Sequence, residues 1–101
     1  MISITQEKLR AWLESKDEGE TVGLRADCYE CVHARFLKAQ GCAAPNVGSY
    51  VYEIDEKGGF KERMLPGWAK RFVRAIDRAH NFQTTAQEAL DALNQAAKET
   101  P

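Results

Sequence analysis

Residues 47–80 read VGSYVYEIDEKGGFKERMLPGWAKRFVRAIDRAH, and this stretch contains two periodicities from which the fold can be predicted. Aromatic and β-branched residues alternate with polar ones over residues 47–54, and an alternation resumes over residues 60–65. Two such segments joined by the glycine-containing turn at 57–59 predict an antiparallel β-hairpin. The segment 66–80 opens with a Pro-Gly pair and its apolar residues recur at helical spacing, so a helix is predicted to follow the hairpin.

Three other segments have the apolar spacing of an amphipathic helix, and a capping residue precedes each of them. Thr5 is the N-cap expected for the first and Asp27 for the second, because such side chains accept hydrogen bonds from the free amides of a first helical turn. Thr85 and Glu88 form a capping box ahead of the last segment, and Gly41 is suited to end the second. The predicted helices cover about residues 6–16, 28–40, 67–80 and 86–98, and a short strand is predicted at 21–24.

Length and composition predict one folded domain. A chain of 101 residues has room for one hydrophobic core, and its 44% hydrophobic and 29% charged residues are in the range of globular proteins. We therefore expect a single α+β domain spanning residues 1–101, in which about four helices pack with a small antiparallel hairpin. The strand at 21–24 is a candidate third strand of the hairpin sheet. Domains of this size enclose deep substrate pockets with difficulty, which argues against an enzyme.

Charge, hydropathy and cysteine content restrict the environment and the partners. The 14 Lys and Arg residues nearly balance the 15 Asp and Glu residues, so no overall field attracts the chain to nucleic acid or to an anionic membrane. Residues 1–5 lack the basic and apolar regions of a signal peptide, and no apolar run approaches the length of a membrane helix. Three cysteines are an odd number and too few for a disulfide scaffold, so reduced thiols in a cytoplasmic protein are expected.

Short motifs run through most of the chain, namely WL at 12–13, VG at 22–23, YxC at 29–31 and LPxWAxxFVxxID at 65–77. Together they resemble the pattern of a group of small bacterial proteins for which no activity is established. The matching residues are mainly core and turn types. The resemblance therefore implies a compact bacterial domain and no catalytic residue.

Cys28 and Cys31 form a C-x-x-C motif at the predicted start of the second helix. A helix dipole can lower the pKa of a thiol there, which is a property of redox cysteines. However, the 13 residues between Cys31 and Pro45 are too few for the strand arrangement of a thioredoxin-like fold, and Glu30 beside the thiols disfavours a thiolate. Cysteines that act as small apolar residues are the simpler interpretation.

The same two cysteines, together with His33 and Cys42, give the pattern C-x2-C-x-H-x8-C, which nominally supplies four zinc ligands. In a helix over residues 28–40, His33 would point about 160° away from Cys31 around the helix axis. Two such side chains cannot bind one tetrahedral ion. The zinc site therefore requires a helix that begins after His33.

Lys70, Arg71, Arg74 and Arg78 occupy one sector of the predicted third helix, opposite its apolar residues. Four cations on one exposed face would suit the phosphates of a nucleic acid or an acidic partner. The alternative is a solvated helix face whose charge is offset by Asp77. The chain has no helix-turn-helix signature and no basic excess, so sequence-specific reading of DNA is not expected.

The sequence contains no Ser-His-Asp grouping, no Gly-rich phosphate loop and no recognisable pair of catalytic carboxylates. By elimination we expect a small non-enzymatic interaction module without a cofactor: an adaptor, an accessory subunit, or an inhibitor or regulator, including one encoded by a phage or mobile element. Its partner is expected to be another protein or protein complex, bound through basic residues 70–78 or the hairpin edge. The alternatives are nucleic-acid binding through the same basic residues, and a thiol redox or zinc site at Cys28 and Cys31.

Overall fold

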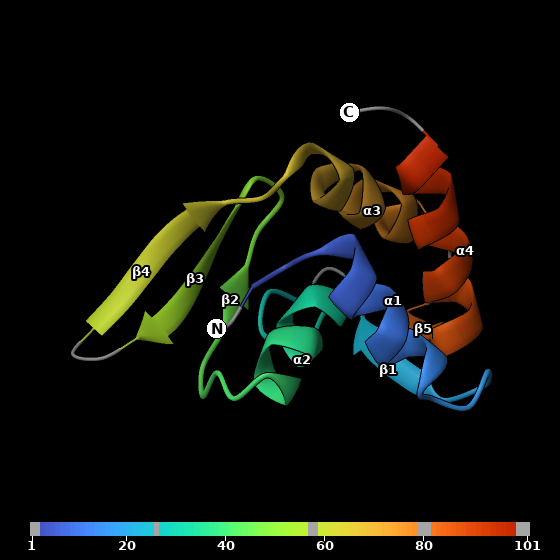
Figure 1. Cartoon of the computed structure of the whole chain (residues 1–101), viewed down its shortest axis with the longest axis horizontal. Coiled ribbons are helices and arrows are strands. Elements are labelled where there is room, and N and C mark those ends of the chain that lie inside the picture. Colours follow the sequence, from blue (N-terminus) through green and yellow to red (C-terminus); the bar gives the residue numbers. More distant parts are fainter. Residues whose placement is uncertain (1–2, 26, 57–58, 79–81, 99–101) are drawn as a thin grey trace.

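Four helices and two small antiparallel sheets make up the part of this computed structural model that is described here, residues 3–25, 27–56, 59–78 and 82–98 (Figure 1). This arrangement confirms the predicted α+β class. The helices are α1 (Gln6–Glu14), α2 (Val32–Ala39), α3 (Gly67–Asp77) and α4 (Ala86–Lys98). The strands are β1 (Thr21–Leu24), β2 (Asn46–Val47), β3 (Val51–Glu56), β4 (Gly59–Met64) and β5 (Gln83–Thr85).

The predicted hairpin is formed by β3 and β4, and it belongs to a three-stranded sheet of order β2-β3-β4. The strand predicted at residues 47–54 is interrupted in its middle. Gly48 donates a backbone hydrogen bond to the carbonyl oxygen of Val51 over 2.9 Å, and this turn separates β2 from β3. The third strand of the sheet is therefore β2, and the segment 21–24 does not fill that place.

β1 pairs with β5 in a second, two-stranded sheet. Thr84 of β5 lies opposite Gly23 of β1. β5 has three residues and was not predicted from the sequence. Figure 1 shows this sheet beside α4, whereas the β3–β4 hairpin extends from the opposite side of the molecule.

The two faces of the hairpin differ in exposure. Tyr52 and Ile54 on β3 are buried, as the alternation of the sequence predicts. Phe60 and Met64 on β4 lie on the opposite face and are 66% and 71% exposed. Tyr50, which the alternation assigns to the buried face, is 60% exposed because it lies in the turn before β3.

Local caps begin or end three of the helices as predicted. The Thr5 hydroxyl accepts a hydrogen bond from the amide of Lys8 over 3.2 Å. Thr85 and Glu88 exchange two hydrogen bonds of 2.9 and 3.2 Å, which is the predicted capping box. Gly41 follows α2 with a φ of 105°, a conformation that favours glycine.

Two of the described helices end two or more residues earlier than predicted. α1 ends at Glu14, and α3 ends at Asp77. The predicted extension of α3 to His80 lies partly outside the described residues. In the described part of the chain, no helix has both the length and the apolar character needed to cross a membrane.

α2 begins four residues later than the predicted start at Cys28. Asp27 does accept hydrogen bonds from two backbone amides, but these belong to Tyr29 and Glu30 in a turn that precedes the helix. The amide of Val47 donates to the carbonyl oxygen of Cys28 over 2.8 Å, which ties this turn to β2. The prediction of a helix over 28–31 is therefore wrong.

The buried apolar residues form two clusters, where the sequence predicted one core. Val32 and Phe36 of α2 belong to the first cluster, and Leu37 belongs to the second, so α2 lies between them. Trp68 at the start of α3 packs against both. The first cluster is built mainly from α1, α3 and α4 and includes Leu9, Leu13, Phe72 and Leu93, whereas the second includes Val47, Tyr52, Ile54 and Leu65.

Candidate functional site

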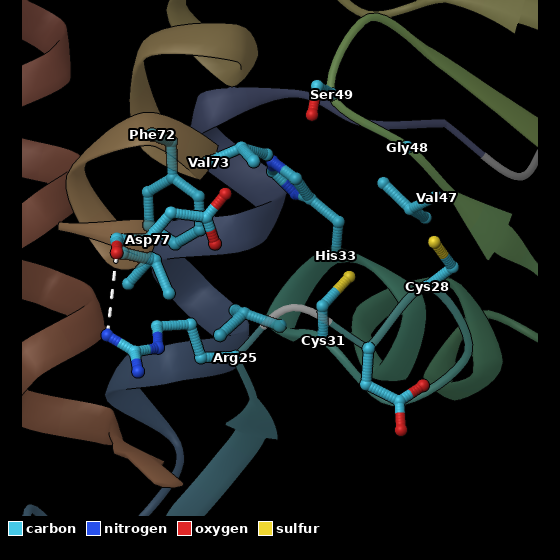
Figure 2. Close-up of a pocket in the computed structure, with 13 residues that line it drawn as sticks. Arg25, Cys28, Cys31, His33, Val47, Gly48, Ser49, Phe72, Val73 and Asp77 are labelled. Carbon is cyan, nitrogen blue, oxygen red and sulfur yellow. Dashed lines mark hydrogen bonds between the residues drawn. The ribbon is translucent and has the colours of Figure 1, made fainter. Parts of the chain in front are cut away.

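A cavity of about 230 Å³ lies where the two clusters meet, and we call it the α2–α3 pocket (Figure 2). Four segments line it: the turn before α2, the first turn of α2, the end of β2 with the residues after it, and α3. Both clusters contribute to its apolar walls, which are formed by Val32, Val47, Phe72, Val73 and Ile76. The pocket is therefore a product of the tertiary fold and not of one motif.

His33 is a deeply buried polar side chain of this pocket. It is 1% exposed, and its ring centroid lies 4.9 Å from that of Phe72 and 6.0 Å from that of Trp68. Its Nε2 lies 3.4 Å from the carbonyl oxygen of Ala69. Because a carbonyl oxygen only accepts, this hydrogen bond requires a proton on Nε2. Nδ1 is then an acceptor, and it has no hydrogen-bond partner among the described residues.

Burial keeps His33 uncharged. Removal from water disfavours the imidazolium form and lowers the pKa of His33 to about 4, although the hydrogen bond to Ala69 acts in the opposite direction. At neutral pH the pocket thus contains a neutral imidazole with an unpaired lone pair. Buried acceptors are rarely left without a donor, because the lost hydration is not replaced. Nδ1 of His33 is therefore the atom of the pocket best suited to receive a ligand.

Cys31 lines the same pocket, half-buried at the N-cap position of α2 (Figure 2). Removal from water raises the pKa of its thiol to about 11, and the amides of Ala34 and His33 at the start of the helix only partly oppose this. The thiol is therefore protonated at neutral pH. A redox or nucleophilic cysteine needs a lowered pKa, so the surroundings of Cys31 favour a small lining residue over a reactive one.

The other two cysteines lie in different surroundings. Cys28 is exposed at the edge of the pocket, whereas Cys42 is buried in the second cluster. The Cys42 thiol donates a hydrogen bond to Oδ1 of Asp55 over 2.9 Å. Within the described ranges, no group of three or more His, Cys, Asp or Glu side chains is placed to hold a metal ion. The four nominal zinc ligands are thus not brought together.

Charged and polar side chains surround the opening of the pocket. Arg25 donates a hydrogen bond from Nη1 to the carbonyl oxygen of Asp77 over 3.5 Å, the dashed line in Figure 2. This contact links the turn before α2 to the end of α3. Asp27 and Ser49 are further polar residues of the lining. The rim therefore carries charges of both signs around an apolar interior.

The four basic residues predicted on α3 lie in two settings. Lys70 is half-buried, and its Nζ lies 6.0 Å from the centroid of the Tyr50 ring, just before β3. Arg71, Arg74 and Arg78 instead line a small groove between α3 and α4. Arg74 and Arg78 are exposed, whereas Arg71 donates from Nε to a backbone carbonyl oxygen of α4 over 3.1 Å. Arg74 and Arg78 are thus presented to solvent, and no such contact joins them to the described residues of α4 or the hairpin.

No family model, curated protein or solved structure matches this chain. The resemblance to small bacterial proteins through the motif at residues 65–77 therefore stays a prediction.

Sequence reasoning missed the α2–α3 pocket and considered His33 only as a zinc ligand. The chain offered one relevant signal, because Phe72 and Ile76 are among the apolar residues at helical spacing in segment 66–80, and both line the pocket. No pattern along the sequence indicates that His33 would lie against them. That contact depends on how α2 and α3 pack together.

Proposed function

We propose that this protein is a small, non-enzymatic interaction module that binds another protein through the outer face and edge of the β3–β4 hairpin. The exposure of Phe60 and Met64 on β4, 66% and 71%, carries this proposal. They stand on the same face of one strand because they are four residues apart. Large apolar side chains exposed on one face of a strand are typical of binding surfaces, since covering them removes apolar area from water.

The backbone of β4 supports the same proposal. Among the described residues β4 pairs with β3 alone, so its outer edge offers amide and carbonyl groups to solvent. Figure 1 shows the hairpin extending away from the helices, where a partner strand would have access to this edge. Addition of a strand to an exposed edge is a common mode of peptide recognition.

Acidic side chains accompany the apolar ones on the outer face of the hairpin. The register pairs Glu53 with Glu62, so these two carboxylates lie on the same face as Phe60 and Met64. An apolar patch among carboxylates complements a partner segment that carries an apolar anchor beside Lys or Arg. We therefore expect a partner with a basic and apolar contact surface.

Affinity capture from the native host tests the proposal. The wild-type chain is compared with the double variant Phe60→Ser/Met64→Ser, and Phe82→Ser is the matched control because Phe82 is 58% exposed outside the hairpin. We expect a specific protein to be retained by the wild type and the control, and to be depleted at least roughly tenfold by the double variant. Equal recovery of every captured protein with the double variant would contradict docking through the hairpin.

A second candidate function is nucleic-acid binding through the basic residues of α3, which the groove beside α4 supports. Arg74 and Arg78 are exposed there and are available for phosphate contacts. If they make such contacts, affinity for DNA or RNA falls with rising salt. Arg74→Glu/Arg78→Glu should then reduce the slope of log affinity against log salt concentration by about two. Binding that is absent or independent of salt would remove this candidate.

A further inference from the structure

We propose that the α2–α3 pocket binds a small, uncharged ring compound with one hydrogen-bond donor, such as a phenol or an indole, and that this donor binds Nδ1 of His33. The site is separate from the hairpin, and the proposal does not depend on the interaction function. Its basis is the size of the pocket, the apolar walls and the unpaired acceptor.

The volume of the pocket suits a compact ring. An engineered apolar cavity of roughly 150 Å³ in another protein is large enough to bind benzene. The α2–α3 pocket measures about 230 Å³, which leaves space for a ring with a small substituent or for two fused rings. A dinucleotide or a folded peptide is too large for this volume.

The walls favour an apolar, planar ligand body. Burial of a ring between these side chains removes apolar surface of the ligand and of the pocket walls from water. Phe72 offers an aromatic neighbour for offset or edge-to-face packing. The remaining apolar walls are aliphatic and come from Val32, Val47, Val73 and Ile76.

The requirement for a donor comes from His33. Its Nε2 is already bonded to the carbonyl oxygen of Ala69, so Nδ1 is left as a buried acceptor. A ligand hydroxyl or N–H group would give Nδ1 the partner that it lacks. A ligand of the same shape without a donor leaves this atom unpaired and gains no hydrogen bond from it, so it binds more weakly than one with a donor.

The charges around the pocket favour an uncharged ligand. His33 itself is neutral at neutral pH because burial lowers its pKa to about 4, so it does not neutralise an anion. Asp77 is exposed, and Arg25 and Asp27 are only half-buried. The side chains of these three residues therefore lie near solvent, and a charged ligand in the apolar interior would lose its hydration without a buried counter-charge.

Binding of p-cresol and toluene to the full chain tests the proposal, because the two compounds differ only by the hydroxyl group. Each is titrated into ¹⁵N-labelled protein, and amide resonances of α2 and α3 and the ring nitrogens of His33 are followed by NMR. We expect p-cresol to bind about 3- to 10-fold more tightly than toluene and to shift the Nδ1 resonance. Equal or weaker binding of p-cresol, or no saturable shift of pocket resonances with either compound, would overturn the proposal.

Two variants on neighbouring residues of α3 locate the site. Val73 lines the pocket, so Val73→Phe fills part of it, whereas Arg74 does not line it and Arg74→Phe is the matched control. We expect Val73→Phe to abolish saturable binding of p-cresol and Arg74→Phe to leave it unchanged. Wild-type affinity in a folded Val73→Phe variant would overturn the proposal. If that variant does not fold, the comparison of p-cresol with toluene on the wild-type chain is the test of the proposal.

Discussion

Arg71 on α3 donates a hydrogen bond from Nε to the carbonyl oxygen of Ala96 on α4, over 3.1 Å. Ala96 lies in the last turn of α4, where carbonyl oxygens have no amide partner within the helix. The guanidinium group thus satisfies one of these oxygens and places a positive charge at the negative end of the helix dipole. One of the residues predicted for binding therefore also holds two helices together.

Arg71→Met should destabilise the fold more than Arg74→Met. The first substitution removes the hydrogen bond to α4, whereas Arg74 is exposed. We expect the free energy of unfolding to fall by about 1 kcal/mol for Arg71→Met and by less than about 0.5 kcal/mol for Arg74→Met. Urea unfolding followed by tryptophan fluorescence measures both values. Equal losses would show that the contact with α4 contributes nothing to stability.

Gly23 of β1 lies against the start of α2. A Cβ atom at this position would be 2.5 Å from the backbone nitrogen of Val32 and 2.9 Å from the carbonyl carbon of Cys31. Backbone atoms cannot rotate out of the way, so Gly23→Ala should lower the free energy of unfolding by about 2–3 kcal/mol. Thermal unfolding followed by circular dichroism measures the loss.

Gly19→Ala is the matched control for this substitution. A Cβ atom at Gly19 would meet no atom of the described residues within 4 Å, so its effect should stay within about 0.5 kcal/mol. If Gly23→Ala were as stable as Gly19→Ala, the close approach of β1 to α2 would be refuted.

Most of the helical structure could be predicted because its signals are local. Thr5 caps α1 and the Thr85–Glu88 pair caps α4 through contacts that span three residues. Gly41 ends α2 through its own backbone conformation. Such interactions form between residues close together in the sequence and need no distant partner.

The elements that sequence reasoning missed depend on contacts with residues far away in the sequence. Asp27 accepts amide hydrogen bonds equally well in a turn and at a helix start, and the bond from Val47 to Cys28 is what holds the turn. The segment 83–85 is a strand only because β1 lies beside it. The α2–α3 pocket depends on the packing of four segments and on the burial of His33 against α3. Neither can be predicted from the spacing of residues within one segment.

Cys31 should react slowly with alkylating reagents at neutral pH. Its thiol pKa is raised from 9.0 to about 11 by burial, so its thiolate fraction is about 100-fold below that of an ordinary thiol. In a Cys28→Ser variant, iodoacetamide labelling of the peptide that contains Cys31 should accelerate about tenfold per pH unit up to about pH 11. Mass spectrometry of the digest measures the rate.

The reciprocal variant Cys31→Ser is the control for this labelling. It leaves Cys28, which is exposed, so the labelling rate of its peptide is the reference for an accessible thiol. If Cys31 were labelled as fast as Cys28 at neutral pH, burial would not raise the pKa of its thiol.

Acid should destabilise the protein through His33. In the unfolded chain this imidazole binds a proton with the ordinary pKa of 6.5, whereas burial lowers its pKa to about 4 in the folded protein. Between these values the unfolded state holds a proton that the folded state excludes, so the free energy of unfolding decreases as pH falls from 6.5 to about 4. The contribution is fully present above pH 6.5 and amounts to about 3 kcal/mol.

Urea unfolding of the wild type and of His33→Phe over this pH range measures the effect. Asp27 and Asp77, which line the same pocket, and the other carboxyl groups are present in both proteins, so the difference between the two slopes isolates His33. As pH falls, the free energy of unfolding of the wild type should decrease more steeply than that of His33→Phe. The difference between the two slopes should reach about 1.4 kcal/mol per pH unit. An NMR titration of the His33 ring gives the folded-state pKa directly and needs no variant. Equal slopes in the two proteins, or a ring that titrates near 6.5, would show that His33 is not held neutral by burial.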